Sequence, residues 1–272
     1  AETDAQIAFV DLMGRFADHL TPKELHEQRA PFYYHGENFQ AALVLAKTLG
    51  MSEAVTALTQ SLASFAKNNR DFQGAKRLFE MLVNHCNQQR NEHGAASTYH
   101  QLGMIAEEQR DFKQAEQWYL KSLAITEKQG NEHHAASTYH QLGVIAQKQR
   151  KFEQARQWYR KSLVIKEKQG NEQGMAITYH QLGMIAQEQR KFEQAEQWCL
   201  KSLAINEKQG DEYGVARTYH QLGVIAEKQR NLNQAEQWYL KSLAINEKQG
   251  NEHGVASTYA QLGLFSASRL EW

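Results

Sequence analysis

The sequence predicts an all-α solenoid built from antiparallel helix pairs, and three observations lead to this fold class. A 40-residue block recurs four times, and the copies at 171–210 and 211–250 share 29 of 40 residues. The only two prolines, Pro22 and Pro31, lie near the N-terminus, and the rest is rich in the strong helix formers Ala, Leu, Glu, Lys and Gln. A fixed period of about 20–50 residues is typical of solenoids, whose units bury their apolar faces against neighbouring units. The four copies start at Asn91, Asn131, Asn171 and Asp211.

The segment 1–50 is less regular than the rest. Thr21-Pro22-Lys23-Glu24 has the pattern of a helix start, with a capping box and a proline at the first helical position. A degenerate helix pair then ends at Gly50. The sequence therefore predicts an irregular N-terminal helical segment.

The segment 51–90 is a diverged copy of the repeat. Ala63 stands where Gly103 stands in the next copy, and Leu78 replaces the recurring tryptophan. Four of its residues still align with the clean copies, namely Leu62, Arg70, Phe72 and Ala75.

Within each of the four near-identical repeats of 91–250, the pattern predicts two helices. In the first copy apolar residues follow steps of four, three and four residues over about 93–109, which is the stripe of an amphipathic helix. Asp111 has the position of an N-cap, so a second helix is expected from Phe112 after a turn near Arg110. Gly130 fits the left-handed position that ends a helix. Gly103 inside the first helix predicts a close approach of the second helix. The segment 251–272 matches the first helix of a partial terminal repeat.

These residues carry a family resemblance. The spacing Tyr99-x2-Leu102-Gly103, followed by Ala115 and Tyr119, resembles the tetratricopeptide repeat over about 53–272. The usual unit has 34 residues, and the 40-residue unit resembles the longer arrays of kinesin light chains and bacterial regulators. The resemblance implies a right-handed superhelix. By fold analogy, the worn N-terminal pair also resembles the helical sensor region of bacterial signal-transducing (STAND-type) NTPases.

The resemblance also implies that the first helix of each repeat lines a concave groove that binds a partner. A ladder of histidine and glutamine offers hydrogen-bond donors and acceptors to a peptide. The alternative is that duplication copied these residues with the rest of the unit. The candidate partner-binding residues are His100, Gln101, Met104, His140, Gln141, Val144, His180, Gln181, Met184, Arg217, His220, Gln221 and Val224.

Catalytic, metal and cofactor sites are not expected. One histidine per repeat places successive imidazoles about 10 Å apart, whereas a shared zinc ion needs ligand atoms at about 2.0–2.1 Å. The chain has no phosphate loop, no G-x-G-x-x-G, no H-E-x-x-H, no C-x-x-C and no G-x-S-x-G. The recurring tryptophan, first seen at Trp118, is interpreted as inter-repeat core. The sequence therefore predicts no enzyme.

Composition narrows the partners and the compartment. Lys and Arg balance Asp and Glu at 31 each, so neither nucleic acid nor a membrane is expected as a partner. No apolar run approaches the roughly 20 residues of a membrane helix. Cys86 and Cys199 are nearly three repeats apart, so reduced thiols and a cytoplasmic location are expected.

The function predicted from these features is a protein- or peptide-binding scaffold or sensor module. One alternative is a small-molecule-responsive regulatory region of a larger signal-transducing NTPase or transcription regulator. A second alternative is a self-assembly module. Weak self-association through 259–272 is expected, because a terminal first helix without its second helix leaves Tyr259, Leu262 and Phe265 partly uncovered.

Overall fold

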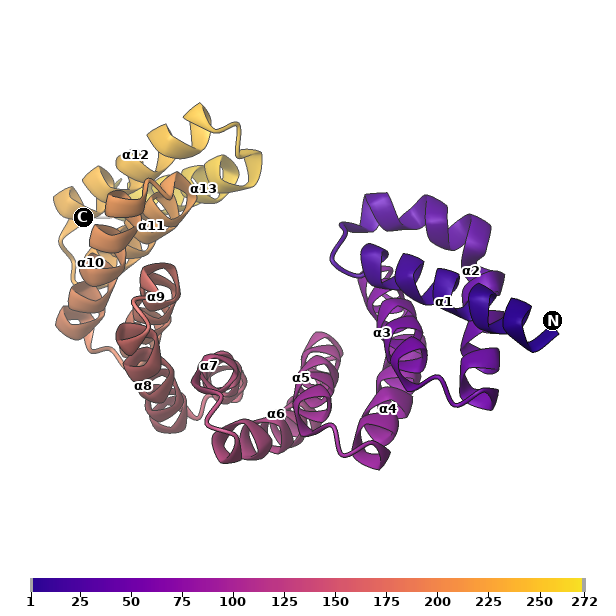
Figure 1. Cartoon of the computed structure of the whole chain (residues 1–272). Coiled ribbons are helices and arrows are strands. Elements are labelled where there is room, and N and C mark those ends of the chain that lie inside the picture. Colours follow the sequence, from indigo (N-terminus) through magenta and orange to yellow (C-terminus); the bar gives the residue numbers. More distant parts are fainter. Residues whose placement is uncertain (1, 271–272) are drawn as a thin grey trace. The chain divides into compact units, whose positions relative to one another are not determined.

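The computed structural model describes the backbone of residues 2–270 and the side chains of residues 2–263. Every regular element in the described residues is an α-helix, and short turns join consecutive helices (Figure 1). The chain divides into two compact units, Ala1–His134 and Ala135–Trp272. The predicted all-α fold of antiparallel helix pairs is confirmed.

The helices of the first unit are α1 (Glu2–Leu20), α2 (Leu25–Thr48), α3 (Ser52–Asn68), α4 (Phe72–Gln88), α5 (Glu92–Glu108) and α6 (Phe112–Lys128). The second unit holds most of α7 (Glu132–Lys148), followed by α8 (Phe152–Lys168), α9 (Glu172–Glu188), α10 (Phe192–Gln209), α11 (Glu212–Lys228), α12 (Leu232–Lys248) and α13 (Glu252–Leu270).

Each unit is a stack of helix pairs. In the first unit α3 packs on α1, α2 and α4, while α5 packs on α4 and α6. In the second unit α9 packs on α8 and α10, and α11 packs on α10, α12 and α13. Apolar residues from neighbouring pairs form the core between them, as Phe79, Leu82 and Leu102 do in the first unit. This is the arrangement in which each repeat is covered by its neighbours.

The turn residues behave as the repeat pattern predicts. The Asp111 carboxylate accepts a hydrogen bond from the backbone N–H of Gln114 at 3.0 Å, and α6 starts at Phe112. Gly130 has φ +63°, which is the left-handed conformation expected at a helix end. The turn at Arg110 is also left-handed, with φ 58°.

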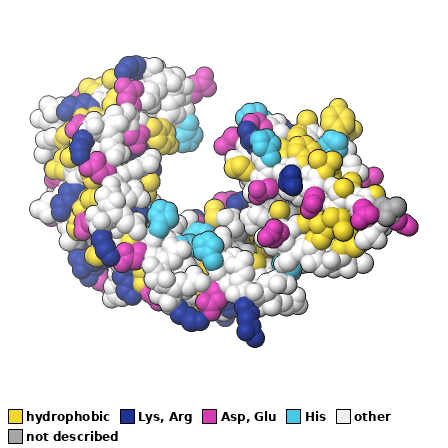
Figure 2. Space-filling view, in the orientation of Figure 1, with side chains coloured by type: hydrophobic (Ala, Val, Ile, Leu, Met, Phe, Trp, Pro, Cys, Tyr) yellow, Lys and Arg dark blue, Asp and Glu magenta, His cyan; other side chains and the backbone are white. Residues whose placement is uncertain are grey.

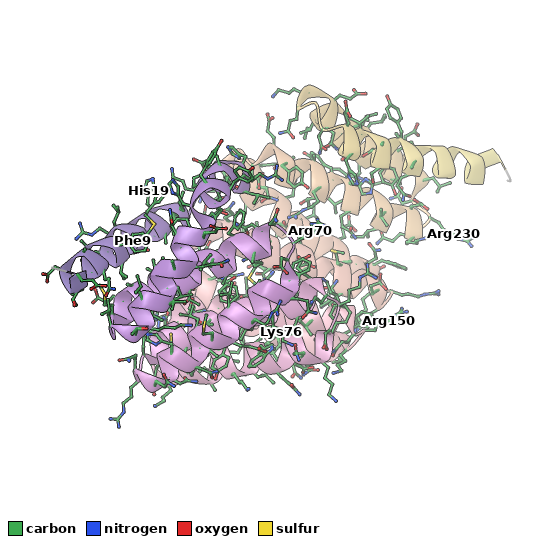
Figure 3. The ribbon with its side chains drawn as sticks, turned by 90° about the vertical axis from the view of Figure 1, so that its right-hand side faces the viewer. Phe9, His19, Arg70, Lys76, Arg150 and Arg230 are labelled. Carbon is green, nitrogen blue, oxygen red and sulfur yellow. The ribbon has the colours of Figure 1, made fainter. Side chains whose placement is uncertain are left out.

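Arginine takes a left-handed conformation at six turns, and the sequence pattern did not reveal it. For L-residues this region costs roughly 1–2 kcal/mol relative to the right-handed one. Figure 3 labels Arg70, Arg150 and Arg230 at three of these turns. The six residues are Arg70, Arg90, Arg110, Arg150, Arg190 and Arg230.

The N-terminal segment differs from the prediction. A regular helix, α1, occupies residues 2–20, and α2 starts at Leu25 rather than at Thr21. The Thr21 hydroxyl instead donates to the Ala17 carbonyl at 3.0 Å, at the end of α1. Glu24 caps α2, because its backbone N–H donates to the Glu27 carboxylate at 3.0 Å in a capping box.

Gly103 has the packing role that the sequence predicts. A Cβ atom there would lie 2.6 Å from the ring of Tyr119, which is fully buried on α6. In the third repeat Cys199 takes the place of the tyrosine, and a Cβ at Gly183 would still lie 2.7 Å from its Sγ. Helices therefore approach closely at this point in both cases.

Candidate functional site

The predicted site residues lie on the first helix of each clean repeat. His100, Gln101 and Met104 are on α5 in the first unit, and the others are on α7, α9 and α11 in the second. The glutamine and the Met or Val of each repeat are half-buried and share one side of their helix. We call these eight side chains the first-helix strip: Gln101, Met104, Gln141, Val144, Gln181, Met184, Gln221 and Val224.

The histidines lie deeper than the strip. His100 and His180 are buried at 9% and 5% exposure, and His140 and His220 are half-buried. The ring of His140 lies 5.1 Å from the ring of Tyr159. The four histidines line the boundary between successive first helices.

Two of these histidines also contact the next repeat. His140 Nδ1 lies 3.5 Å from the Thr178 hydroxyl, and His220 Nδ1 lies 3.4 Å from the Thr258 hydroxyl. His180 differs, because its buried Nδ1 has no hydrogen-bond partner among the described residues. His140 and His220 thus connect successive repeats as well as bordering the strip.

Burial keeps these histidines neutral. It lowers the pKa of His100 to about 4, and that of His140 and His180 to about 3. Nearby cations add to this effect, with Lys166 acting on the pKa of His140 and Arg217 on that of His180. Burial also lowers the pKa of His220. At neutral pH each ring can donate one hydrogen bond and accept one, so the ladder carries no charge.

Departures from the repeat mark the exposed end of the face. Ser97 and Ser137 correspond to Ile177 in the third repeat and to Arg217 in the fourth. Ile177 is 38% exposed, and Arg217 is also exposed. Tyr213, one turn before Arg217, is 60% exposed. Ile177 and Arg217 stand where the other copies carry Ser, and Tyr213 stands where they carry His or Gln. The second unit therefore presents an aliphatic, a cationic and an aromatic side chain at these exposed positions.

The tryptophans are less buried than the sequence interpretation held. Trp118 is half-buried, with its ring stacked 5.6 Å from that of Tyr99. Lys121 Nζ lies 4.3 Å from the Trp118 ring centroid, which is a cation–π contact. The lysine three residues after each tryptophan was the signal for this stack. Equivalent stacks occur at Trp158, Trp198 and Trp238.

A buried lysine was also missed. Lys166 is 8% exposed, and its Nζ donates to the Thr178 hydroxyl at 2.9 Å and to the Gly174 carbonyl at 3.3 Å. Burial lowers the pKa of its ammonium group to about 8. Thr126, Asn206 and Asn246 hold this position in the other repeats. The available signal was a single lysine at a position where the other repeats carry small polar residues.

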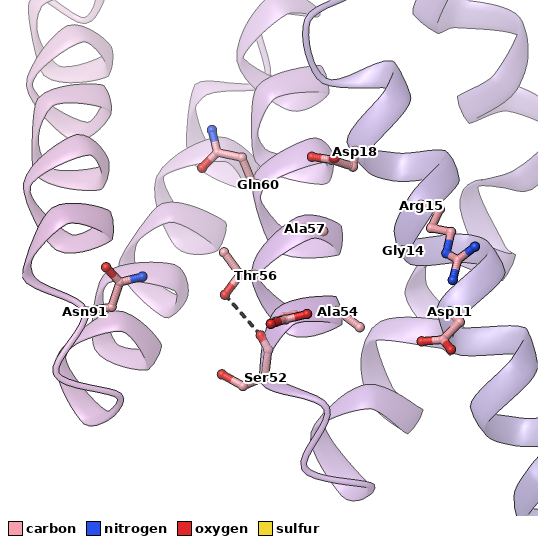
Figure 4. A pocket seen from close by; sticks show the side chains of 11 residues that line it. Asp11, Gly14, Arg15, Asp18, Ser52, Ala54, Thr56, Ala57, Gln60 and Asn91 are labelled. Atoms are coloured by element: carbon pink, nitrogen blue, oxygen red, sulfur yellow. Dashed lines mark hydrogen bonds between the residues drawn. The ribbon is translucent and has the colours of Figure 1, made fainter.

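The first unit has a separate hollow of about 600 Å³ between α1 and α3 (Figure 4). Its wall includes Asp11, Arg15 and Asp18 from α1, with Thr56 and Gln60 from α3. The Thr56 hydroxyl donates to the carbonyl of Ser52 within its own helix at 3.1 Å. None of the predicted site residues lies in this hollow.

Figure 2 shows apolar side chains gathered on the surface of the first unit. In the same unit Tyr33 and Tyr34 are 83% and 74% exposed, and Leu12 and Val44 are also exposed. The described residues contain no group of three or more His, Cys, Asp or Glu side chains that could hold a metal ion. Within that part of the chain, no helix combines the length and apolarity needed to cross a membrane.

The predicted self-association surface falls largely outside the described side chains. Tyr259 is 53% exposed and Leu262 is half-buried. The side chains from Leu264 onward, with that of Phe265 among them, are outside the described residues. Self-association through 259–272 therefore stays a prediction.

Several solved structures have a similar fold. The chain aligns with BtubC (BKLC) from P. vanneervenii at a TM-score of 0.67 and 19% identity, covering 89% of this chain and 92% of that one. For a putative kinesin light chain from Podosopora anserina, with nearly identical TPR-like repeats, the TM-score is 0.62 at 17% identity, over 71% and 95% of the two chains.

A third similar structure is a STAND signal-transduction ATPase with a tetratricopeptide repeat sensor, PH0952 from Pyrococcus horikoshii. It aligns at a TM-score of 0.68 and 15% identity, covering 93% of this chain but 39% of that protein. No curated protein matches the sequence. The family model of the tetratricopeptide repeat matches residues 53–128, 94–168 and 174–248. The chain belongs to the tetratricopeptide repeat family.

Proposed function

We propose that this protein is a non-catalytic scaffold or sensor module that binds a protein or peptide along the first-helix strip. The observation that carries the proposal is the recurrence of this strip, since each clean repeat offers a half-buried glutamine beside a half-buried Met or Val. A peptide can bind there through amide hydrogen bonds and apolar contacts at regular intervals. In tetratricopeptide arrays, this surface lines the concave groove.

The histidine side chains border the first-helix strip and lie deeper than its glutamines. Their burial and neutrality suit a role as neutral hydrogen-bond groups at its border. The strip itself has no charge, so binding along it is expected to depend only weakly on salt. Ile177, Tyr213 and Arg217 supply the selectivity, because they are exposed departures from the repeat.

Two features support a cytoplasmic, interaction-based role. Cys86 and Cys199 are both buried and free, and burial raises the pKa of the Cys199 thiol to about 12, so it is a poor nucleophile.

The second candidate function is a small-molecule sensor. The hollow between α1 and α3 favours it, because its volume of about 600 Å³ suits a small ligand.

A library of random twelve-residue peptides, screened on the immobilised protein, tests the proposal. To block the strip, Ser97→Trp and Ser137→Trp place indoles at exposed positions of α5 and α7. The matched control places the same side chain at exposed positions of α6 and α10, as Ala124→Trp and Ala204→Trp.

Peptides selected on the wild type are expected to lose binding to the first pair of variants and to keep it with the control pair. Failure of the library to yield any binder would refute the proposal. So would peptides that bind the first pair as well as the wild type.

A further inference from the structure

The turns inside the helix pairs of the second unit form a strongly basic edge. The segments 147–151, 187–191 and 227–231 join α7 to α8, α9 to α10, and α11 to α12. They hold seven cations against two carboxylates, Glu188 and Glu227, and all seven cations are exposed. We call the seven side chains the basic edge: Lys148, Arg150, Lys151, Arg190, Lys191, Lys228 and Arg230.

The first unit offers an internal comparison. Its corresponding turns, 67–71 and 107–111, hold three cations against four carboxylates. The charge of the second unit is therefore not a general consequence of this turn. It arises because Lys151 and Lys191 replace the acidic caps Asp71 and Asp111, and because Lys148 and Lys228 replace Glu108.

The backbone at the basic edge suggests that its arginine side chains have a use. Arg150, Arg190 and Arg230 have φ values of 59°, 59° and 62°, a region that glycine enters without strain. In the second unit, the turns between pairs use glycine at such positions, as at Gly170 and Gly210. Strained conformations of this kind persist where the surroundings or a function require them.

Duplication alone does not account for these arginines. Arg70 is left-handed at the same turn of the diverged segment 51–90, where Leu-Gly and the tryptophan of the repeat are lost. The side chain therefore survives where much of the repeat has changed.

Local geometry leaves room for an incoming acidic group. Arg190 and Lys228 line a hollow of about 390 Å³ together with Gln187, Glu188 and Phe192. Glu188 makes an ion pair with Arg150 at 3.9 Å between two exposed side chains. Exposed pairs of this kind contribute little and exchange readily, so a partner carboxylate can take the place of Glu188.

We propose that the basic edge docks an acidic segment of a partner protein, in an extended conformation across successive turns. Stacked helices lie about 8–10 Å apart, and an extended chain of the polyproline II type advances about 3.1 Å per residue with three residues per turn, so that every third side chain points the same way. An acidic side chain at about every third position would therefore meet one turn after another. Duplex DNA suits the edge less well, because its charges come every ~1.7 Å and would meet Glu188 and Glu227.

The probe is a fluorescein-labelled peptide of about 21 residues, Glu-Gly-Ser repeated, whose binding is followed by anisotropy. Binding is expected at low salt, with at least about a tenfold loss when salt rises to physiological levels. The triple variant Arg150→Gly, Arg190→Gly, Arg230→Gly is expected to bind at least about tenfold more weakly. Its melting temperature should be unchanged or higher, because glycine adopts positive φ without strain.

Two controls accompany the triple variant. Arg70→Gly with Arg110→Gly removes two left-handed arginines from the first unit, where the turns are acidic overall, and should leave binding unchanged. A peptide of the same composition with its glutamates clustered should bind more weakly than the spaced one.

Several outcomes would overturn the proposal. One is that the spaced peptide does not bind at low salt, and another is that the triple variant binds it as tightly as the wild type. A third is a lower melting temperature of the triple variant, which would show that the arginines stabilise the fold. Equal binding of the clustered peptide, or tighter binding of single-stranded DNA of the same charge, would do so as well. A negative result for the basic edge would not contradict peptide binding along the first-helix strip. That binding is tested separately by Ser97→Trp and Ser137→Trp, which lie on the same side of α5 and α7 as the strip.

Discussion

Replacing Lys166 by methionine should stabilise the protein at neutral pH. Its ammonium group is buried, with two hydrogen bonds and a pKa of about 8 instead of the usual 10.5. At about 1.4 kcal/mol per pKa unit, the burial cost is at most about 3 kcal/mol. Methionine keeps the apolar stem and leaves no orphaned hydroxyl, because Thr178 itself donates to the Gly174 carbonyl at 2.8 Å.

The net gain is smaller than this bound. Lys166 Nζ loses two hydrogen bonds, and at about 1 kcal/mol each they offset about 2 kcal/mol of the gain. Lys166→Met should therefore raise the free energy of unfolding by about 1 kcal/mol at pH 7, or the melting temperature by about 2 °C for a chain of this length. Equilibrium unfolding in urea measures the first quantity, and a thermal scan the second.

The pH dependence gives an independent check. Between pH 8 and 10.5 the unfolded wild type binds more protons at Lys166 than the folded protein does, so this contribution makes wild-type stability rise with pH. The advantage of Lys166→Met should therefore shrink from pH 7 to pH 10. Lys168→Met, at an exposed lysine of the same helix, should change stability by less than about 0.5 kcal/mol. A variant that is less stable at pH 7, or a gap that does not shrink with pH, would refute the reasoning.

Three further outcomes are expected. Gly103→Ala should lower the free energy of unfolding by about 1–2 kcal/mol, because its Cβ would lie 2.6 Å from the Tyr119 ring. In the same urea assay Gly263→Ala should be neutral or stabilising, because no described atom lies within 4 Å of an added Cβ there. Trp158→Ala should cost about 2–3 kcal/mol in the same assay, less than a fully buried tryptophan, since the ring is half-buried in a stack, and an unchanged melting curve would contradict this.

For the histidines, the folded pKa values near 3–4 lie below the unfolded value of about 6.5. Below pH 6.5 the unfolded state therefore binds more protons, and stability should fall as the pH drops toward 4. His140→Gln with His180→Gln should move the acid midpoint, followed by circular dichroism, to lower pH; an unmoved midpoint would argue against this.

The repeat pattern predicted most of the fold because its signals are local. Asp111 caps a helix through its own third neighbour, and Gly130 ends one by its own φ, so both could be recognised from a few adjacent letters. The start of α2 was misplaced because Thr21 has a cap's chemistry but bonds backward to Ala17. Two competing partners for one hydroxyl cannot be ranked from sequence.

The sequence predicted on which helices the candidate residues lie, but not how deeply each side chain is buried. Register placed Gln101 and His100 on one helix, yet adjacent residues point about 100° apart, and only packing determines which of them is covered. His100 proved to be buried against neighbours from α6 and α7. Lys166 escaped notice because a lysine near a helix end usually lies in solvent, and its burial depends on α9, eight or more residues away.

The contact between Gly103 and Tyr119 sets unequal limits on how the two helices of a repeat can diverge. At the tyrosine's position the third repeat carries Cys199, and the helices still leave no space for a Cβ at Gly183. In the clean repeats the second helix can therefore accept a large change in volume, whereas the first helix leaves no space for a methyl group at the glycine; of the described repeats, only the diverged segment 51–90 carries one there, at Ala63. Future drift in this array, and any attempt to build new repeats from it, should be freer on the second helix of each pair than on the glycine that faces it.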